Sequence, residues 1–307
     1  MKGRVIKSTG SWYIVQTDSQ LVSARLKGKF KQDELKLTNP IAVGDWVILE
    51  KEPNLETAII TEILPRDNYV IRKSTRKQHF SHIIASNLDQ AMLVITMKNP
   101  RTSLGFIDRF LVSTESFRIP AILVVNKMDL LAGESAEDWL LDIHEIYEPL
   151  GYSVIEVSAL YTENPKELFQ PILANKTTLI SGHSGVGKST LLNALIPEAA
   201  QSTKEISSFS DKGVHTTTFA ELFPLEYEGS LIDTPGIKEF GILDVDDFEL
   251  SHYFPEMRKY LGQCKYNNCQ HVNEPGCMVL KKMEQGYIHP YRYESYLNIL
   301  NEEDNRR

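Results

Sequence analysis

Residues 182–189, Gly-His-Ser-Gly-Val-Gly-Lys-Ser, constrain the fold of this chain more than any other segment, because they fit the phosphate-loop pattern G-x-x-x-x-G-K-[ST]. Lys188 is expected to reach the β- and γ-phosphates, and the Ser189 hydroxyl to ligate Mg²⁺. The run 177–181 predicts a strand before the loop, and 189–195 predicts a helix whose N-terminus faces the phosphates. The expected phosphate-site residues are Gly182, His183, Ser184, Gly185, Val186, Gly187, Lys188, Ser189 and Thr190.

A second motif predicts which base the site accepts. Asn126-Lys127-Met128-Asp129 follows a predicted buried strand at 121–125. A carboxylate at Asp129 can accept hydrogen bonds from the ring N–H and the exocyclic amine of guanine, a donor pair that adenine lacks. Ser158 and Ala159 end the next predicted strand and are expected to add a backbone N–H for the guanine carbonyl. Together with the phosphate loop, these residues indicate a site for GTP or GDP.

The predicted strand 230–233 leads into Asp233-Thr234-Pro235-Gly236. We expect Asp233 to hold Mg²⁺ through water and the Gly236 N–H to face the γ-phosphate. A threonine of the loop 213–218 is the expected second Mg²⁺ ligand, and the pattern favours Thr217, with Thr216 as the alternative. All these motifs lie at the carboxyl ends of predicted parallel strands, where open α/β sheets bind ligands.

The residue after Gly236 is Ile237, at the position where many GTPases place a glutamine that orients the attacking water. An aliphatic side chain cannot orient water, so intrinsic hydrolysis is expected to be slow. His215 is a candidate for the water-positioning group; the alternative is a histidine that packs or contacts a partner. The candidate catalytic residues are therefore His215, Lys188 and Gly236.

The motifs occur in an unusual order, because Asn126 and Ser158 precede Gly182 whereas ordinary small GTPases begin with the phosphate loop. This order indicates a circular permutation, which domains tolerate because their termini often lie close together. The switch segment then leads directly into whatever follows residue 242. Movement coupled to the γ-phosphate is expected to pass to that C-terminal segment.

The N-terminal residues 1–64 predict a small all-β domain. Five short β-branched or aromatic runs are separated by turn signals, at 4–7, 12–16, 21–26, 46–49 and 58–63. Such strands suit a small closed barrel, of which the oligonucleotide-binding (OB) barrel is one type. Residues 1–36 carry eight Lys/Arg against three Asp/Glu on a chain of net charge −8, so the barrel is a candidate RNA surface. A purely structural barrel with solvated charges is the alternative.

The rest of the chain predicts an α/β domain followed by a different architecture. The polar, basic residues 65–87 predict a connector. Buried-strand runs at 90–96, 121–125 and 153–157 alternate with helical patterns at 106–117 and 137–150, which predicts a parallel sheet covered on both faces. After residue 242 strand signals stop, and a helical pattern begins near Val279.

All three cysteines of the chain gather around one histidine, as Cys264-x4-Cys269-x-His271-x5-Cys277. Three thiolates and an imidazole are a recognised tetrahedral set for structural Zn²⁺. His252 and His289 are the substitutes if His271 is not a ligand, and reduced cysteines in a loop are the alternative without metal. No apolar run approaches the roughly 18 residues of a membrane span, and the N-terminus lacks a signal-peptide pattern, so a cytoplasmic location is expected.

Taken together, these residues resemble the circularly permuted, ribosome small-subunit-dependent GTPases of the RsgA family, also called YjeQ or YloQ. The resemblance covers essentially the whole chain, with no departure at a motif position. It implies an OB-fold barrel at 1–68, a permuted P-loop GTPase domain at 75–241 and a mostly helical zinc-binding domain at 242–307. It also implies a monomeric late assembly factor that binds the small ribosomal subunit and its rRNA and hydrolyses GTP faster there.

Two other classes of function remain open on the residues alone. One is a protein-partnered signalling GTPase switch without an RNA partner. The other is an ATP-using kinase or phosphotransferase in which N-K-x-D occurs by chance.

Overall fold

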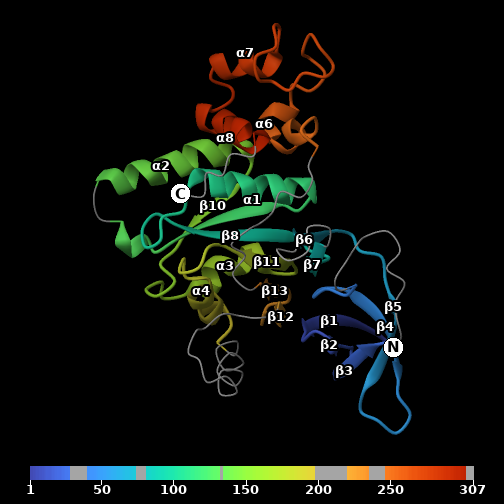
Figure 1. Ribbon diagram of the computed structural model, residues 1–307. Coiled ribbons are helices and arrows are strands. Elements are labelled where there is room, and N and C mark those ends of the chain that lie inside the picture. The colour runs from blue at the N-terminus through green and yellow to red at the C-terminus, as the bar shows by residue number, and fades with distance from the viewer. Residues whose placement is uncertain (28–39, 74–80, 132–133, 198–219, 235–245, 302–307) are drawn as a thin grey trace.

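The computed structural model describes residues 1–27, 40–73, 81–131, 134–197, 220–234 and 246–301. An 11-stranded sheet with the order β10-β9-β8-β11-β13-β12-β1-β2-β3-β5-β4 runs from a helix-covered half into a barrel. Figure 1 shows the barrel in blue at lower right, the helix-covered sheet at the centre and the C-terminal helices in red above it. No helix in the part of the chain that the structure describes is long and apolar enough to cross a membrane.

The N-terminal strands close into the predicted five-stranded barrel. β1 pairs with both β2 and β4, and β3 pairs in parallel with β5, so the order β1-β2-β3-β5-β4 returns to β1. Alternate residues such as Val5, Val15, Val47 and Ile60 fill the interior. The strands are β1 (Lys2–Ser8), β2 (Tyr13–Gln16), β3 (Leu21–Leu26), β4 (Trp46–Lys51) and β5 (Ala58–Ile63).

The segment expected to be a connector contains a hairpin instead, so that prediction was wrong. β6 (Tyr69–Lys73) pairs antiparallel with β7 (Ser81–Ser86). The hairpin forms because Val70, Ile83 and Ala85 are fully buried, an alternation that the charged residues around it obscure in the sequence. The hairpin is tied to the barrel by Asp45, which accepts hydrogen bonds from Arg66 and from the Ser86 hydroxyl.

The central sheet is parallel apart from one strand. Five strands run the same way, and β12 (Glu221–Pro224), which the sequence pattern did not predict, runs antiparallel beside β13. The parallel strands match the predicted apolar runs closely, because a strand buried on both faces reads as a continuous apolar segment. They are β8 (Gln90–Thr96), β9 (Ala121–Asn126), β10 (Ser153–Glu156), β11 (Thr177–Ser181) and β13 (Ser230–Asp233).

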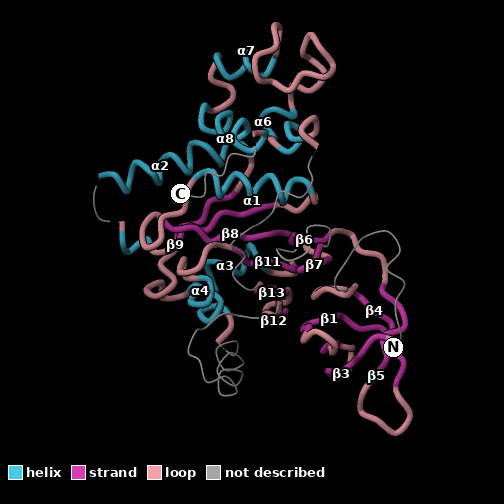
Figure 2. The backbone as a smooth tube through the Cα atoms, in the orientation of Figure 1, coloured by secondary structure: helices cyan, strands magenta, loops and turns pink. Residues whose placement is uncertain are grey.

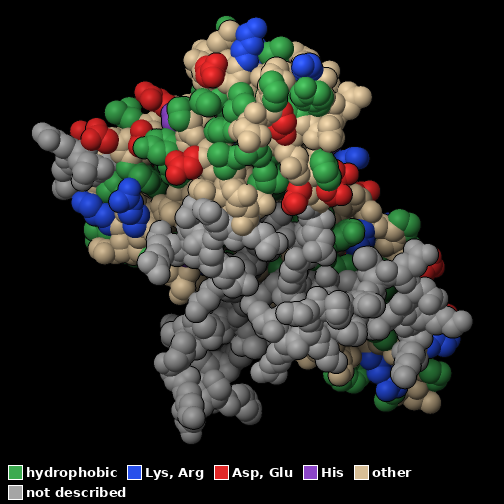
Figure 3. Space-filling model, turned by 45° about the horizontal axis from the view of Figure 1, so that its top comes forward, with side chains coloured by type: hydrophobic (Ala, Val, Ile, Leu, Met, Phe, Trp, Pro, Cys, Tyr) green, Lys and Arg blue, Asp and Glu red, His purple; other side chains and the backbone are tan. Residues whose placement is uncertain are grey.

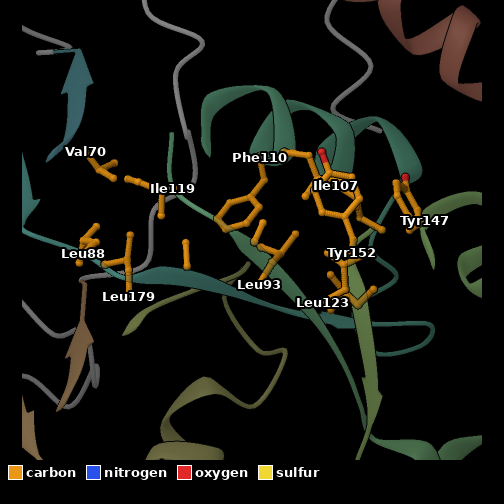
Figure 4. Close-up of a cluster of buried hydrophobic side chains, with 14 of the residues drawn as sticks. Val70, Leu88, Leu93, Ile107, Phe110, Ile119, Leu123, Tyr147, Tyr152 and Leu179 are labelled. Carbon is orange, nitrogen blue, oxygen red and sulfur yellow. The ribbon is translucent and has the colours of Figure 1, made fainter. Parts of the chain in front are cut away.

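Helices cover both faces of this sheet. α1 (Leu104–Ser116) and α2 (Glu134–Tyr147) pack on one face, where Phe110 points toward Leu93 within the cluster of Figure 4, which also includes Leu179. α3 (Pro165–Leu173) and α4 (Lys188–Leu195) pack on the other through side chains that include Phe169 and Leu191. Two short 3₁₀ turns, η1 (Met128–Leu130) and η2 (Glu148–Leu150), complete this part of the chain.

The C-terminal part is helical and packs on α1. Its elements are η3 (Leu250–Tyr253), α6 (Pro255–Arg258), α7 (Met278–Glu284) and α8 (Pro290–Leu300), and Figure 2 shows loops between them. Val112 of α1 belongs to the same apolar cluster as Phe254 and Tyr296, so the C-terminal part shares a core with the central domain.

A buried ion cluster joins the two parts. Arg292 of α8, 1% exposed, contacts Asp108 of α1 and Glu256 of α6, and the Tyr147 hydroxyl of α2 donates to Asp108 at 2.8 Å. Burial alone would lower the pKa of Arg292, but the two carboxylates outweigh it and raise that pKa. Three elements of two domains therefore depend on one guanidinium.

Replacing Arg292 with methionine is expected to destabilise the protein by about 3–5 kcal/mol, because two buried carboxylates lose their partner. Urea unfolding followed by circular dichroism measures this. The matched control is Arg258→Met, which breaks the exposed Arg258–Glu115 pair between the same two parts and should cost less than about 1 kcal/mol. Equal losses for the two variants would contradict the account.

Candidate functional site

The phosphate loop connects β11 to α4, as its motif requires. Gly182 has φ +143°, and a Cβ there would lie 2.3 Å from the Val94 carbonyl oxygen. Gly187 has φ +95°, and a Cβ there would lie 2.3 Å from Nδ2 of Asn126. Only glycine fits at both positions. The loop backbone is therefore held against β8 on one side and against the N-K-x-D motif on the other.

Lys188 closes over its own loop. Its ammonium donates to the carbonyl oxygens of Gly182 at 2.6 Å and His183 at 2.8 Å. Burial lowers the pKa of Lys188, and nearby Asp233 opposes this shift. A partly desolvated cation beside a carboxylate at the mouth of a phosphate loop is placed to attract phosphate oxygens.

Asn126 and Lys127 join the base motif to the phosphate loop. The Asn126 side chain donates to Val186 O at 2.8 Å, and its oxygen accepts from the Ala159 N–H at 3.0 Å. Lys127, with φ +63°, donates to Gly185 O at 2.7 Å and also to Asn99 O. Four loops at the carboxyl edge of the sheet, those that follow β8, β9, β10 and β11, are thus fixed to one another.

Asp129 and Ser158 lie together at this edge. The Asp129 N–H donates to the Ser158 hydroxyl at 2.9 Å, and the Asp129 side chain is exposed. The sequence pattern assigns a backbone N–H of Ser158 or Ala159 to the guanine carbonyl, and the Ala159 N–H donates here to Asn126. Asp233 ends β13 and Thr234 follows it, and the Thr234 hydroxyl donates to Ile180 O in β11 at 3.4 Å. The structure therefore brings the predicted base motif and Asp233, the predicted Mg²⁺ residue, to one edge of the sheet.

Four predicted site residues lie outside the described residues: His215, Thr216, Thr217 and Gly236, together with the neighbouring Ile237. Their roles stay predictions.

The sequence pattern did not predict one contact of the phosphate loop. The His183 ring stacks on Phe106 of α1, with ring centroids 3.6 Å apart. Burial lowers the pKa of His183, and the Lys188 charge lowers it further. The Asn99–Lys127 contact was also missed. The only signal in the sequence was that Asn99 lies just after a predicted parallel strand, where ligand-binding loops gather.

The cysteine cluster forms a compact donor set. The ligand atoms of Cys264, Cys269, His271 and Cys277 all lie within 4.8 Å of one another. Cys264 Sγ is 4.0 Å from Cys277 Sγ, and His271 Nδ1 is 3.4 Å from Cys277 Sγ. Ligand atoms around a tetrahedral zinc lie roughly 3.5–3.8 Å apart. The set therefore fits Zn²⁺ with little rearrangement.

Burial raises the pKa of the Cys269 thiol to about 12 and lowers the pKa of His271. A divalent cation would offset the shift of the thiol by stabilising the thiolate, and the lowered pKa of His271 favours the neutral imidazole that binds metal. The surrounding loop is built to hold the set: Glu274 accepts from the backbone N–H groups of Gln270 and Val272. His289, one of the two substitute ligands, caps α8 by accepting a hydrogen bond from the Tyr291 N–H. Its ring is therefore used outside the cysteine cluster.

The barrel exposes aromatic and basic side chains together. Trp12 is 41% exposed and Trp46 37% exposed. The Lys2 ammonium lies 4.7 Å from the centroid of the Trp46 ring. Aromatic faces beside cations suit single-stranded nucleic acid, because bases stack while phosphates meet positive charge.

Comparison with known proteins places both halves of this architecture in one family. Residues 63–243 match the family model for the RsgA GTPase, and residues 2–60 match the model for the RsgA N-terminal domain. A Cytophaga hutchinsonii protein named small ribosomal subunit biogenesis GTPase RsgA is 51% identical over 309 residues, covering 100% of both chains. A Bacteroides fragilis protein of the same name is 49% identical, covering 99% of this chain and 97% of its own.

Two solved structures share the whole architecture. YjeQ from Thermotoga maritima superposes with a TM-score of 0.77 at 33% identity, covering 100% of this chain and 99% of its own. YloQ, described as a circularly permuted GTPase, superposes with a TM-score of 0.74 at 31% identity, covering 100% and 96%.

Proposed function

Because this chain belongs to the RsgA family of GTPases and is a GTP-hydrolysing enzyme, we propose that it acts as a late maturation factor of the small ribosomal subunit. The full-length similarity to relatives named for small-subunit biogenesis carries this proposal. Because the chain belongs to a GTPase family, the alternative of an ATP-using kinase or phosphotransferase is excluded. The proposal includes a cytoplasmic monomer whose functional units are residues 1–68, 75–241 and 242–307.

We propose the following roles in the GTPase site. The glycines of 182–187 aim backbone N–H groups at the phosphates, and Lys188 stabilises charge on the β- and γ-phosphate oxygens. Ser189, at the first turn of α4, and Asp233, at the end of β13, offer the hydroxyl and carboxylate oxygens that suit Mg²⁺. When bound, Mg²⁺ neutralises phosphate charge. Thr217 is the proposed second ligand, and His215 the proposed water-positioning group.

Asp129 is the proposed determinant of guanine specificity. Asp129→Asn is expected to weaken GTP binding by about 100-fold or more, because the ring N–H and exocyclic amine lose their acceptor. The same variant should accept xanthosine triphosphate, whose carbonyl at the amine position can accept from the new amide. Titration with fluorescent nucleotides measures both affinities. Asp138→Asn, an exposed change on α2, is the control; unchanged specificity in Asp129→Asn would exclude the role.

The Cys264, Cys269, His271 and Cys277 set is proposed to hold one structural zinc ion, because four protein donors leave no open coordination position. Its loop lies against α8 through the Tyr296 hydroxyl, which donates to Gln270 O at 2.6 Å. The metal would thereby fix the surface that the C-terminal domain presents.

Two surfaces support an RNA-rich partner. On the barrel, Trp46 lies beside Lys2. On the C-terminal domain, hydrophobic side chains are visible in Figure 3, and Tyr287, 65% exposed, lies under Lys282 at 4.5 Å. Such aromatic and basic pairs are suited to rRNA, since stacking and phosphate contacts act together.

Co-sedimentation with purified small subunits tests the proposed partner. The protein should pellet with the subunits when a non-hydrolysable GTP analogue is bound, and less with GDP. The affinity should fall steeply with salt, because phosphate contacts release counterions. Absence of binding in both nucleotide states would overturn the proposal, and a protein partner that alone stimulates hydrolysis would favour the signalling alternative.

A further inference from the structure

Strand β1 begins in the barrel and ends in the GTPase core. Val5 is fully buried in the barrel interior. The pairing of β1 with β2 then shifts register between Val5 and Lys7, which marks a bulge. Ile6, inside this bulge, packs against the central-domain cluster that contains Leu222 and Ile232. The end of β1 therefore contacts both parts, because Lys7 and Ser8 still pair with β2 while Ile6 and Lys7 contact the central domain.

Lys7 pairs β1 of the barrel with β12 of the central domain within the 11-stranded sheet. It is the one residue of β1 in register with β12, opposite Glu221. Its ammonium lies 3.0 Å from Oε1 and 2.9 Å from Oε2 of that carboxylate. Both side chains are only 21% exposed, so this pair is better shielded from solvent than a surface ion pair.

Glu221 is also in register with Asp233 on its other side. Lys7, Glu221 and Asp233 thus occupy one row across three neighbouring strands, and residues directly opposite in a sheet interact. Glu221 also follows Thr217 by four residues in the sequence. One ion pair therefore links the barrel to a strand adjoining both proposed Mg²⁺-site segments.

The barrel is also tied to the central domain at a second place. Arg4 donates to the Thr177 hydroxyl at 2.9 Å, at the start of the strand that leads to the phosphate loop. Arg4 also donates to the carbonyl oxygens of Gly44 and Asn87. A barrel held at Thr177 and at Glu221 can shift β12 relative to β11 when its position changes.

We propose that Lys7 and Glu221 are positioning residues for stimulated hydrolysis. When a small subunit binds the barrel, the Lys7–Glu221 pair transmits the barrel's position to β12. The neighbouring Asp233 is thereby placed for GTP hydrolysis. The inference rests on the proposed function, since it assigns the regulation of that same GTPase site. Neither residue touches nucleotide; each acts through the strand that it positions.

Charge reversal separates positioning from a structural role. Lys7→Glu, Glu221→Lys and the double swap are compared with wild type for intrinsic and small-subunit-stimulated GTP hydrolysis. Subunit affinity by co-sedimentation, KM for GTP and the thermal midpoint are measured beside the rates. The matched control is the same reversal at Lys166 and Glu226, an exposed pair that bridges α3 to the turn after β12.

Each single reversal should lower the stimulated kcat about tenfold, a coupling of ordinary size, while intrinsic hydrolysis, KM and subunit affinity stay within about twofold of wild type. The double swap should restore stimulation, and the Lys166 and Glu226 reversals should leave it unchanged. Lys7→Arg, which keeps the charge, should also behave as wild type.

Wild-type stimulation in both single variants would overturn the inference while leaving the proposed function intact. A double swap that fails to restore stimulation would overturn it as well. If wild-type protein itself shows no stimulation by small subunits, the proposed function fails first, and the inference falls with it.

Discussion

Lys188→Met should lower the rate of GTP hydrolysis by about a thousandfold or more, the usual consequence of removing a preorganised charge from a transition state. Lys188 is held above the phosphate loop by the carbonyl oxygens of Gly182 and His183, and it lies near Asp233. These contacts keep the ammonium at the phosphate loop, where its charge can act on phosphate oxygens. Methionine keeps most of the stem but removes the charge.

Single-turnover hydrolysis with enzyme in excess measures this rate without product release. Lys166→Met, which removes a partly exposed ammonium from α3, is the matched control and should hydrolyse GTP as wild type does. The thermal midpoint of Lys188→Met should stay close to wild type. A loss below about tenfold would show that phosphate charge is stabilised mainly by backbone N–H groups.

Removal of the metal from the Cys3His cluster should have the second large effect, on the stability of the C-terminal segment. A chelator, or Cys277→Ser, should release one zinc ion per chain and expose residues 246–301 to proteolysis. Structural zinc contributes roughly 10 kcal/mol of binding free energy to small folded segments. In the C-terminal segment, few elements other than α6, α7 and α8 stabilise the fold besides the metal. Metal analysis combined with limited proteolysis measures both effects.

His252→Ala is the matched control, because His252 lies near His271 but is not in the donor set. It should retain zinc and protection. GTP binding should survive metal loss in Cys277→Ser, since the phosphate loop and β9 are held by the central core. Protein purified without chelator that contains no zinc would contradict the assignment.

The middle of the central sheet was predictable from sequence because β8 and β9 are buried on both faces and form nearly continuous apolar runs. Their predicted bounds, 90–96 and 121–125, agree with the structure to within one residue. The same predicted strand ends placed the motif residues at the carboxyl edge of the sheet. The order of Asn126 and Gly182 in the chain was sufficient to predict the permutation.

Other features could not be predicted from the sequence, for physical reasons. α3 contains Pro165 and Pro171, which weaken its helical signal. β12 has only four residues, and its partner on one side is a barrel strand distant in sequence. Arg292 reads as a solvated charge, whereas its burial depends on Asp108, 184 residues away. Pairings between distant segments leave no local pattern for sequence inspection to find.

The most direct test of the central claim is the rate of GTP hydrolysis by the purified full-length protein with and without purified small ribosomal subunits. The protein alone should hydrolyse GTP slowly, because Ile237 occupies the usual glutamine position. Small but not large subunits should stimulate hydrolysis strongly, and the stimulation should weaken as salt rises. Equal rates with and without small subunits, in protein that binds GTP, would contradict the central claim.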